Sequence, residues 1–228
     1  MRHPVTLNKP GETILLMGNE AIVRGALEAG IRIATSYPGT PASEIGNTFA
    51  EVAKETGIHF EWSTNEKVAF EVVYGASMCG QRGMVSMKHV GLNVALDIME
   101  MAALRGVKGG LVFVSADDPS QHSSGQEQDQ RWLAKQNCIP VLEPSDPQDA
   151  KDYTVYAYEL SERSKLPAML RTVSLRLYRP DSWLRLRGYL HGPAHHHHQA
   201  QHPPRPHGRA EPAHQRLARP HRRAPGAG

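Results

Sequence analysis

Glu66 is the residue of this sequence whose type and surroundings most clearly suggest chemistry. A short aromatic segment, Phe60–Trp62, is typical of a strand, and the run that begins at Asn65 is rich in small and apolar residues, which favours a helix. Glu66 therefore falls in a first helical turn at the carboxyl end of a strand, where open α/β sheets bind ligands and a carboxylate can take part in proton transfer. The structural alternative is an ordinary acid at a helix start, capped by Ser63 or Thr64.

The elements around Glu66 alternate between strands and helices. Besides 60–62, buried strands are expected at 31–35, 83–87, 110–115, 139–142 and 167–171. Helices are expected at 20–29 with Asn19 as N-cap, from the region of Glu44 to about residue 56, and at 65–77, 94–104, 132–136 and 147–164. Strands separated by helices in this order predict a doubly wound α/β domain over residues 12–173, which is a parallel sheet with helices on both faces.

Four polar segments follow strands of this predicted sheet. They are Tyr37–Ser43, Thr64–Lys67, Lys88–Asn93 and Asp117–Gln130, and each holds more polar groups than a structural turn requires. Because the carboxyl ends of parallel strands share one edge of a sheet, these segments should form a single rim. We expect Lys88–Asn93 to be a polar turn that contains glycine.

Composition divides the chain into two parts. Residues 174–228 hold ten arginines against two acids and nine of the thirteen histidines, whereas the rest holds sixteen basic and twenty-one acidic residues. The globular part is therefore acidic, and nucleic acid is not expected as its partner. We expect residues 1–11 to be flexible and 174–228 to be a disordered tail. The abrupt change suggests a shifted reading frame or a broken gene copy, and the alternative is a natural basic tail that binds nucleic acid.

Several classes of protein and site are not supported by the sequence. Cys79 and Cys138 stand too far apart for a disulfide framework, a zinc site or an iron-sulfur cluster within this chain. The run His195–His198 has metal-binding side chains but no fold to hold them, so no metal site is predicted. No apolar run approaches the roughly 20 residues of a membrane span, and no signal-peptide core is present, so a cytoplasmic protein without a membrane partner is expected.

Several separated motifs together resemble one enzyme family. They are Ser36-Tyr-Pro-Gly-Thr-Pro-Ala-Ser-Glu44, Asn65-Glu-Lys67, Gly83-Met-Val-Ser-Met-Lys-His-Val-Gly-Leu-Asn93 and Ser115-Ala-Asp-Asp-Pro-Ser-Gln-His-Ser-Ser124. The chain is thereby similar to the 2-oxoacid:ferredoxin oxidoreductases, and most of all to the alpha subunits of the indolepyruvate ferredoxin oxidoreductases. The resemblance covers about 13–172 and implies the N-terminal domain of that family, which binds the pyrimidine end of thiamine diphosphate.

The resemblance implies a role for Glu66. Thiamine diphosphate enzymes place a carboxyl group against N1′ of the aminopyrimidine, and a carboxyl group held away from bulk water can share that proton. The family reaction is the oxidative decarboxylation of aryl 2-oxoacids to acyl-coenzyme A, with electrons passed through 4Fe-4S clusters to ferredoxin. By its place in the matching motif, Glu66 is the predicted catalytic and cofactor-binding residue.

Further site residues follow from the same motifs. Thr40 matches the position that faces the substrate, and Lys88 and His89 are substrate-binding candidates at the end of a strand. Cofactor-binding candidates besides Glu66 are Pro38, Gly39, Gly91 and Asn93. A plain turn threonine and solvent-facing loop residues are the structural alternatives for Thr40, Lys88 and His89.

One position departs from the family pattern. Pyruvate-specific relatives carry an arginine for the substrate where this chain has Asp117 and Asp118. This departure argues against pyruvate, and His122 and Arg131 are the substitutes that we considered.

The resemblance also implies partners that this chain does not supply. The motifs of the family's diphosphate-binding domain, which holds magnesium, and of its iron-sulfur domain are not found here. The predicted partners are therefore that diphosphate-binding domain, the beta subunit, ferredoxin and coenzyme A, and the chain alone should be inactive. Two alternatives stay open: another thiamine diphosphate enzyme, either a decarboxylase or a transketolase-like protein, and a non-catalytic α/β assembly module.

Overall fold

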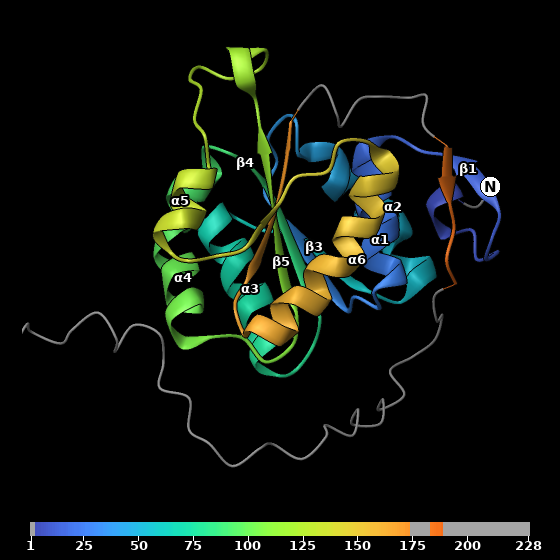
Figure 1. The fold of residues 1–228 in the computed structure, drawn as a ribbon, viewed down its shortest axis with the longest axis horizontal. Helices are drawn as coiled ribbons and strands as arrows, with labels where there is room; N and C mark the ends of the chain where they lie inside the picture. The colour runs from blue at the N-terminus through green and yellow to red at the C-terminus, as the bar shows by residue number, and fades with distance from the viewer. Residues whose placement is uncertain (1–2, 174–182, 189–228) are drawn as a thin grey trace, which may run out of the picture. The chain divides into compact units, whose positions relative to one another are not determined.

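The computed structural model describes residues 3–173 and 183–188. Contacts define one unit of residues 1–193 and a second of 194–228, and the second lies outside the described residues, as does the histidine run at 195–198, for which no metal site was predicted. After a short N-terminal segment, six α-helices and six strands alternate up to residue 173, and the described residues hold two further short strands at 13–15 and 183–185 (Figure 1).

The central sheet has six parallel strands, as the sequence predicted. They are β2 (Ile33–Ser36), β3 (His59–Trp62), β4 (Gly83–Lys88), β5 (Leu111–Asp117), β6 (Val141–Leu142) and β7 (Ala168–Val173). Their order across the sheet is β3-β2-β4-β5-β7-β6, and every neighbouring pair is parallel. All seven residues of β5 are buried, because a strand in the middle of a sheet with two covered faces meets no solvent.

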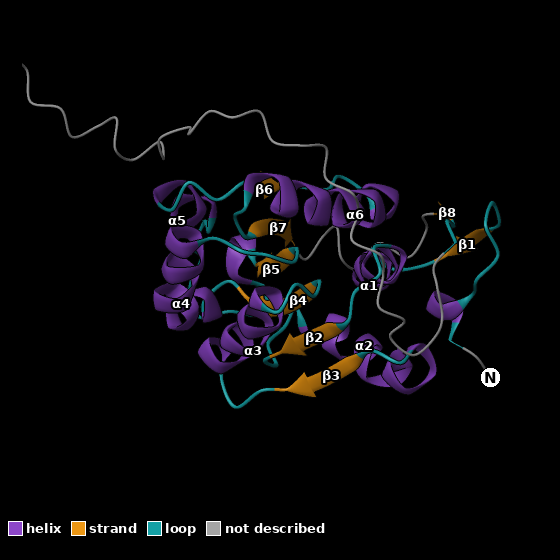
Figure 2. Ribbon diagram, turned by 90° about the horizontal axis from the view of Figure 1, so that it is seen from below, coloured by secondary structure: helices purple, strands orange, loops and turns teal. Residues whose placement is uncertain are grey.

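Helices cover both faces of this sheet (Figure 2). One face carries α1 (Gly18–Glu28), α2 (Ser43–Thr56) and α6 (Pro147–Ser164), and its core includes Ile22, Phe49 and Tyr158. The other face carries α3 (Glu66–Met78), α4 (Gly91–Arg105) and α5 (Arg131–Gln136), with Phe70, Met99 and Phe113 in its core. Two separate apolar cores therefore pack on the two faces of the sheet, which is the doubly wound arrangement that the sequence predicted.

Three helix starts differ from the prediction. The N-cap of α1 is Met17 rather than Asn19, which lies inside the helix, where its side-chain amide donates to the carbonyl oxygen of Pro41 at 3.2 Å. The N-cap of α3 is Asn65 rather than Ser63 or Thr64, since the side-chain Oδ1 of Asn65 accepts from the Val68 N–H at 2.9 Å.

The third difference concerns α4, which begins at Gly91 and not at Val94. Gly91 and Asn93 therefore lie in the first helical turn, and the predicted turn at 88–93 is limited to its first residues. The predicted helix ends at Gly30 and Gly57 are confirmed, because both glycines take positive φ angles, 73° and 70°.

The two ends of the described chain pack on the domain, which the sequence did not predict. In the segment expected to be flexible, Pro4–Thr6 forms a 3-10 helix (η1) and Val5 is fully buried. In the expected tail, β8 (Trp183–Arg185) pairs antiparallel with β1 (Thr13–Leu15) in a separate two-stranded sheet. Leu184 is buried there, so this part of the expectation of a disordered tail is wrong, while 174–182 and 189–228 lie outside the described residues.

A buried group of charges ties these ends to the helices. The Arg24 guanidinium on α1 donates to Glu28 at 2.8 Å and to the main-chain oxygens of Val5 at 3.0 Å and Arg187 at 2.5 Å. Lys151 of α6 lies 3.1 Å from Glu28, and all three ionic side chains are 2% exposed or less. Because each charge is buried and paired, removing one partner would leave another uncompensated.

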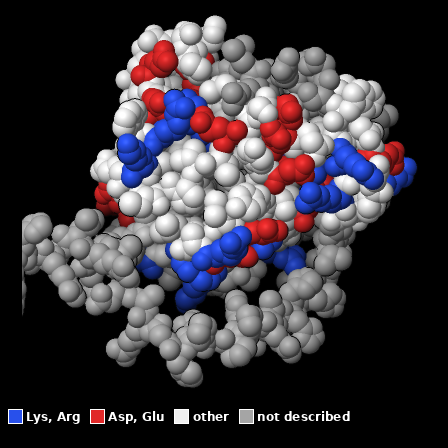
Figure 3. All heavy atoms as spheres, in the orientation of Figure 1, with Lys and Arg blue, Asp and Glu red and all other residues white. Residues whose placement is uncertain are grey.

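The surface that Figure 3 shows carries Lys and Arg side chains beside Asp and Glu side chains, rather than one basic patch. Ion pairs among the described residues include Arg82–Glu162 and Arg131–Asp129, each 2.7 Å long. Among the described residues, the helices are too short or too polar to cross a bilayer.

Candidate functional site

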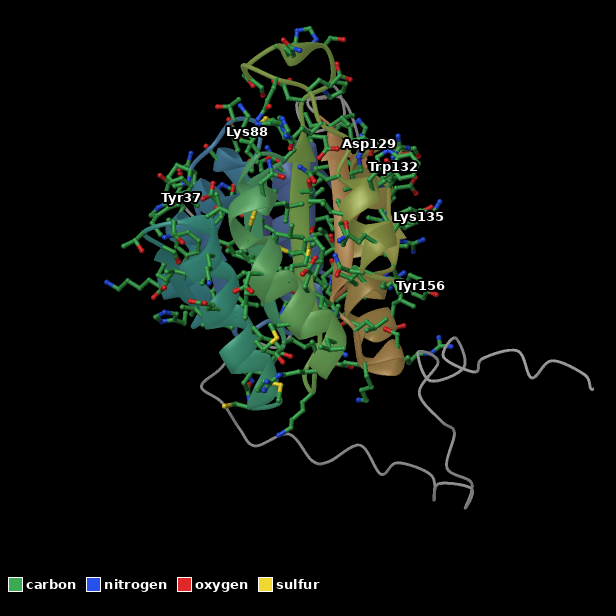
Figure 4. All side chains as sticks on the ribbon, turned by 90° about the vertical axis from the view of Figure 1, so that its left-hand side faces the viewer. Tyr37, Lys88, Asp129, Trp132, Lys135 and Tyr156 are labelled. Carbon is green, nitrogen blue, oxygen red and sulfur yellow. The ribbon has the colours of Figure 1, made fainter. Side chains whose placement is uncertain are left out.

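The carboxyl ends of the strands form one rim, as the sequence predicted. The chain leaves β2 toward the face of α2 and leaves the neighbouring β4 toward the opposite face, that of α4. Two neighbouring strands whose connections part in this way define the switch point at which open α/β sheets bind ligands. Figure 4 shows Tyr37, Lys88 and Asp129 at this end of the sheet.

Glu66 is the first residue of α3 and faces the start of α4. A methyl group built on Gly91 would lie 2.5 Å from both Cγ and Oε1 of Glu66, so only glycine allows this approach. The Glu66 side chain is half-buried, and its carboxylate makes no hydrogen bond or ion pair with any residue in the described ranges. An acid that only stabilises a helix start needs no glycine opposite it. A half-buried carboxylate with open acceptor sites can accept a hydrogen bond from a ligand.

The turn after β2 holds the predicted residues Pro38, Gly39 and Thr40. The Gly39 N–H donates to the Ser43 hydroxyl at 2.9 Å, and the Thr40–Pro41 peptide bond is cis. A methyl group built on Gly39 would lie 3.0 Å from Cβ of Lys88, so this turn touches the turn after β4. Pro38 and Thr40 are exposed beside that contact, where they are accessible to a ligand.

Lys88, the last residue of β4, and His89, the first residue of the turn after it, lie in different environments. Lys88 is half-buried and donates from Nζ to the main-chain oxygen of Ser123 at 2.7 Å. His89 is fully buried, with its Nε2 donating to the main-chain oxygen of Gln126 at 3.2 Å and its Nδ1 lacking a partner among the described residues. His89 is therefore not the solvent-facing residue of the structural alternative, and a ligand could reach it only if the covering loop moved.

That covering loop is the segment 118–130, which contacts both turns at the switch point. Ser123 reaches the main-chain oxygen of Thr40 at 3.3 Å on the β2 side, and on the β4 side Gln128 accepts from Asn93 at 2.9 Å. The predicted residue Asn93 is exposed and is held by this loop. The loop contacts, and with them Ser123, Gln128 and Gln130, were missed because a polar loop sequence does not reveal where it folds back.

Asp117 and Asp118 have structural partners in this loop. Asp117 is buried and accepts from Arg171 and from the Ser115 hydroxyl, both at 2.7 Å. Burial raises the pKa of the Asp117 carboxyl, although its bonds from Ser115 and Arg171 act in the opposite direction. Asp118 accepts from the N–H of Ser123 and the hydroxyl of Ser124, both at 2.7 Å. The two acids thus fix the loop at its base.

His122 and Arg131, the candidates to replace the arginine that pyruvate-specific relatives carry, lie in different environments. Arg131 binds Asp129 at 2.7 Å and Glu143 at 3.4 Å, and this hydrogen bond holds the pKa of Asp129 below its usual range. His122 is exposed in the loop. Arg131 is therefore already paired, and Lys88 is the basic residue that the structure places beside the Gly39 turn.

Known proteins match most of this domain. A family model described as pyruvate flavodoxin/ferredoxin oxidoreductase, thiamine diphosphate-binding, matches residues 24–177. The indolepyruvate oxidoreductase subunit IorA of Pyrococcus horikoshii is 55% identical over 170 residues, which are 75% of this chain and 26% of that subunit. The 2-oxoglutarate synthase subunit KorA of Methanothermobacter thermautotrophicus is 31% identical over 165 residues, 70% of this chain and 44% of that subunit.

A solved structure supports the fold. The 2-oxoglutarate:ferredoxin oxidoreductase from Magnetococcus marinus, with 2-oxoglutarate, coenzyme A and succinyl-CoA bound, superposes with a TM-score of 0.64 at 24% identity. The match covers 75% of this chain and 32% of that chain. The chain thus spans about a quarter of the length of the IorA subunits that it matches.

Proposed function

Because the chain belongs to the pyruvate flavodoxin/ferredoxin oxidoreductase, thiamine diphosphate-binding family, we propose that it forms the pyrimidine-binding half of a thiamine diphosphate site. The observation that carries this proposal is the half-buried Glu66 carboxylate, which rests against Gly91 and has no hydrogen-bond partner among the described residues. The similarity to indolepyruvate oxidoreductase subunits supports an aryl 2-oxoacid as the substrate class.

The residues present fit this cofactor. When bound, thiamine diphosphate supplies the nucleophilic carbon and the electron sink that decarboxylation of a 2-oxoacid requires. Glu66 would hold a proton between its carboxylate and N1′ of the pyrimidine ring, a role that needs an acceptor without a competing protein donor. Gly91 leaves the room for that carboxylate, since any side chain there would displace it. Asn93, Pro38 and Gly39 complete the predicted cofactor contacts.

Lys88 and Thr40 are the residues that we propose for the substrate. Lys88 brings a positive charge to the switch point, and its Nζ donates to the main-chain oxygen of Ser123. A substrate carboxylate is a stronger acceptor and would replace that oxygen as the partner of Lys88. Thr40 is exposed at the turn that touches Lys88. His89 is buried beneath the loop, and we propose that it contacts the substrate only when the loop is displaced.

We propose that a second domain completes the site. We propose that a diphosphate-binding domain supplies the magnesium site, and that further domains and a beta subunit supply 4Fe-4S clusters and the contacts with coenzyme A and ferredoxin. The relatives' remaining length leaves room for such domains. We therefore expect the chain to be inactive alone, and we retain the cytoplasm as its expected location.

Calorimetric titration of thiamine diphosphate with magnesium tests the proposal. The full chain is titrated alone and mixed with the part of the Pyrococcus horikoshii relative that it does not match. Binding is expected only in the mixture, and Glu66→Gln should weaken it at least tenfold, because the amide cannot hold the shared proton. Glu71→Gln is the control, since Glu71 is an exposed acid of the same helix.

Three results would contradict parts of the proposal. Equal binding by the Glu66→Gln and Glu71→Gln chains would show that Glu66 is not the cofactor's partner. Assembly of the mixture without any cofactor binding would favour the non-catalytic assembly module. Oxidation of a 2-oxoacid by the chain alone would overturn the expectation that it holds half a site.

A further inference from the structure

The returning limb of the covering loop, residues 126–130, contacts the β4–α4 turn at every second residue. The main-chain oxygen of Gln126 accepts from His89, and the side chains of Gln128 and Gln130 reach Asn93 and the main-chain oxygen of His89. The residues between them have other partners, since Glu127 accepts from the Ser120 N–H at 3.1 Å.

Gln130 is the buried anchor of this limb. It is 2% exposed, and its amide nitrogen donates to the main-chain oxygen of His89 at 2.6 Å and to Oε1 of Gln128 at 2.9 Å. Its own N–H lies 3.4 Å from the buried carboxylate of Asp117. Gln130 is thus fixed to the base of the loop and uses its side chain to hold the turn.

The oxygen that Gln130 holds also accepts a hydrogen bond from the first turn of α4. The main-chain oxygen of His89 also accepts from the Leu92 N–H at 3.1 Å, so two donors fix its direction. On the other side of Gly91, Asn93 is held by the same Gln128 oxygen that accepts from Gln130. Gly91 therefore lies between His89, whose main-chain oxygen Gln130 binds, and Asn93, which is linked to Gln130 through Gln128.

We propose that Gln130 is a positioning residue that sets the approach of Gly91 to Glu66. The Glu66 carboxylate lies where it does because Gly91 has no side chain, so a shift of the first turn of α4 would move the wall against which the carboxylate rests. Gln130 touches neither residue and acts through His89 and Gln128. Its effect on cofactor binding rests on the function proposed above.

Hydrogen exchange on the full chain tests the positional half of this inference. Gln130→Met keeps the length of the side chain and removes both donors, and exchange of the Leu92 and Asn93 amides should become roughly 5- to 150-fold faster, as expected for one lost buried hydrogen bond. Gln126→Met is the matched control, because its described contact uses only the main-chain oxygen. Gln130→Asn, too short to keep the 2.6 Å bond, should show the same direction if the methionine chain does not fold.

Titration of thiamine diphosphate with magnesium, in the same mixture with the complementary part of the Pyrococcus horikoshii relative, tests the link to Glu66. Gln130→Met should weaken the binding of thiamine diphosphate. In the double variant Gln130→Met and Glu66→Gln, the fold-loss of affinity should be smaller than the product of the fold-losses of the two single variants. Multiplicative losses, or unchanged exchange in both Gln130 variants, would overturn the inference. Faster exchange together with no binding by the wild type would support the positional role and overturn the proposed function instead.

Discussion

Replacing Gly91 with alanine should separate the stability of the domain from its binding function. The added methyl group would lie 2.5 Å from Cγ and Oε1 and 2.8 Å from Cδ of Glu66. Carbon atoms in contact prefer about 3.5–4.0 Å, so the carboxylate must move by about 1 Å or more. Since Glu66 is half-buried and has no hydrogen bond to lose among the described residues, it can rotate away.

The energetic effects on folding nearly cancel. Alanine is favoured over glycine in a helix by up to about 1 kcal/mol, and moving the Glu66 side chain off its present rotamer costs about 0.5–1.5 kcal/mol. The free energy of unfolding should therefore stay within about 1 kcal/mol of the wild type. The binding function should not, because a displacement of about 1 Å in a catalytic group can cost roughly a hundredfold.

Urea denaturation and cofactor titration of the Gly91→Ala chain measure the two quantities. Gly75→Ala is the matched control, because Gly75 lies in α3 and nothing lies within 4 Å of its added methyl group. It should gain helix stability without any loss of thiamine diphosphate binding. Wild-type affinity in Gly91→Ala would refute the reasoning, and a loss of several kcal/mol in stability would show that the carboxylate cannot rotate.

Two further predictions concern stability. Leu184 is buried, so Leu184→Ala should lower the free energy of unfolding, measured by urea denaturation, by about 2–5 kcal/mol. Trp183 is exposed on the same strand, and Trp183→Ala should change it by about 0.5 kcal/mol or less. Equal effects of the two substitutions would mean that β8 does not pack as described. Burial raises the pKa of Glu162, but hydrogen bonds from Arg82 outweigh it and the pKa lies below the usual 4.5. This carboxylate therefore stabilises the fold at neutral pH and loses that effect as the pH falls below about 4.5. The urea midpoint of Arg82→Gln should therefore vary less than that of the wild type between about pH 5 and pH 3. Parallel plots of urea midpoint against pH for the two proteins would contradict this.

Much of the fold was predictable because the local signals agree with the long-range arrangement. Apolar runs such as 110–115 are buried in the sheet, and Gly30 and Gly57 end helices at positive φ as their positions predicted. Helix starts were harder, since several polar residues compete to be the cap and tertiary contacts decide among them. Asn19 illustrates this, because its amide is used by the Pro41 turn.

The sequence predicted that the candidate residues lie on one rim of the sheet, but it did not predict the contacts between them. The motif around Glu66 gave its place at a helix start, yet nothing in the sequence indicated that Gly91 would touch it across two helices. The burial of His89 and the anchoring by Gln130 also depend on how a long polar loop folds back. Such contacts join residues distant in sequence, and no local pattern encodes them.

The pairing of Arg24 has a consequence for synthesis of the chain. Its guanidinium binds the main-chain oxygens of Val5 and Leu7, which are made before it, and that of Arg187, which is made long after it. Until residue 187 has emerged from the ribosome, the nascent chain cannot form the bond from Arg24 to the Arg187 oxygen. Contacts of such large sequence separation form late, so the last step in closing this domain waits for a segment beyond its final sheet strand.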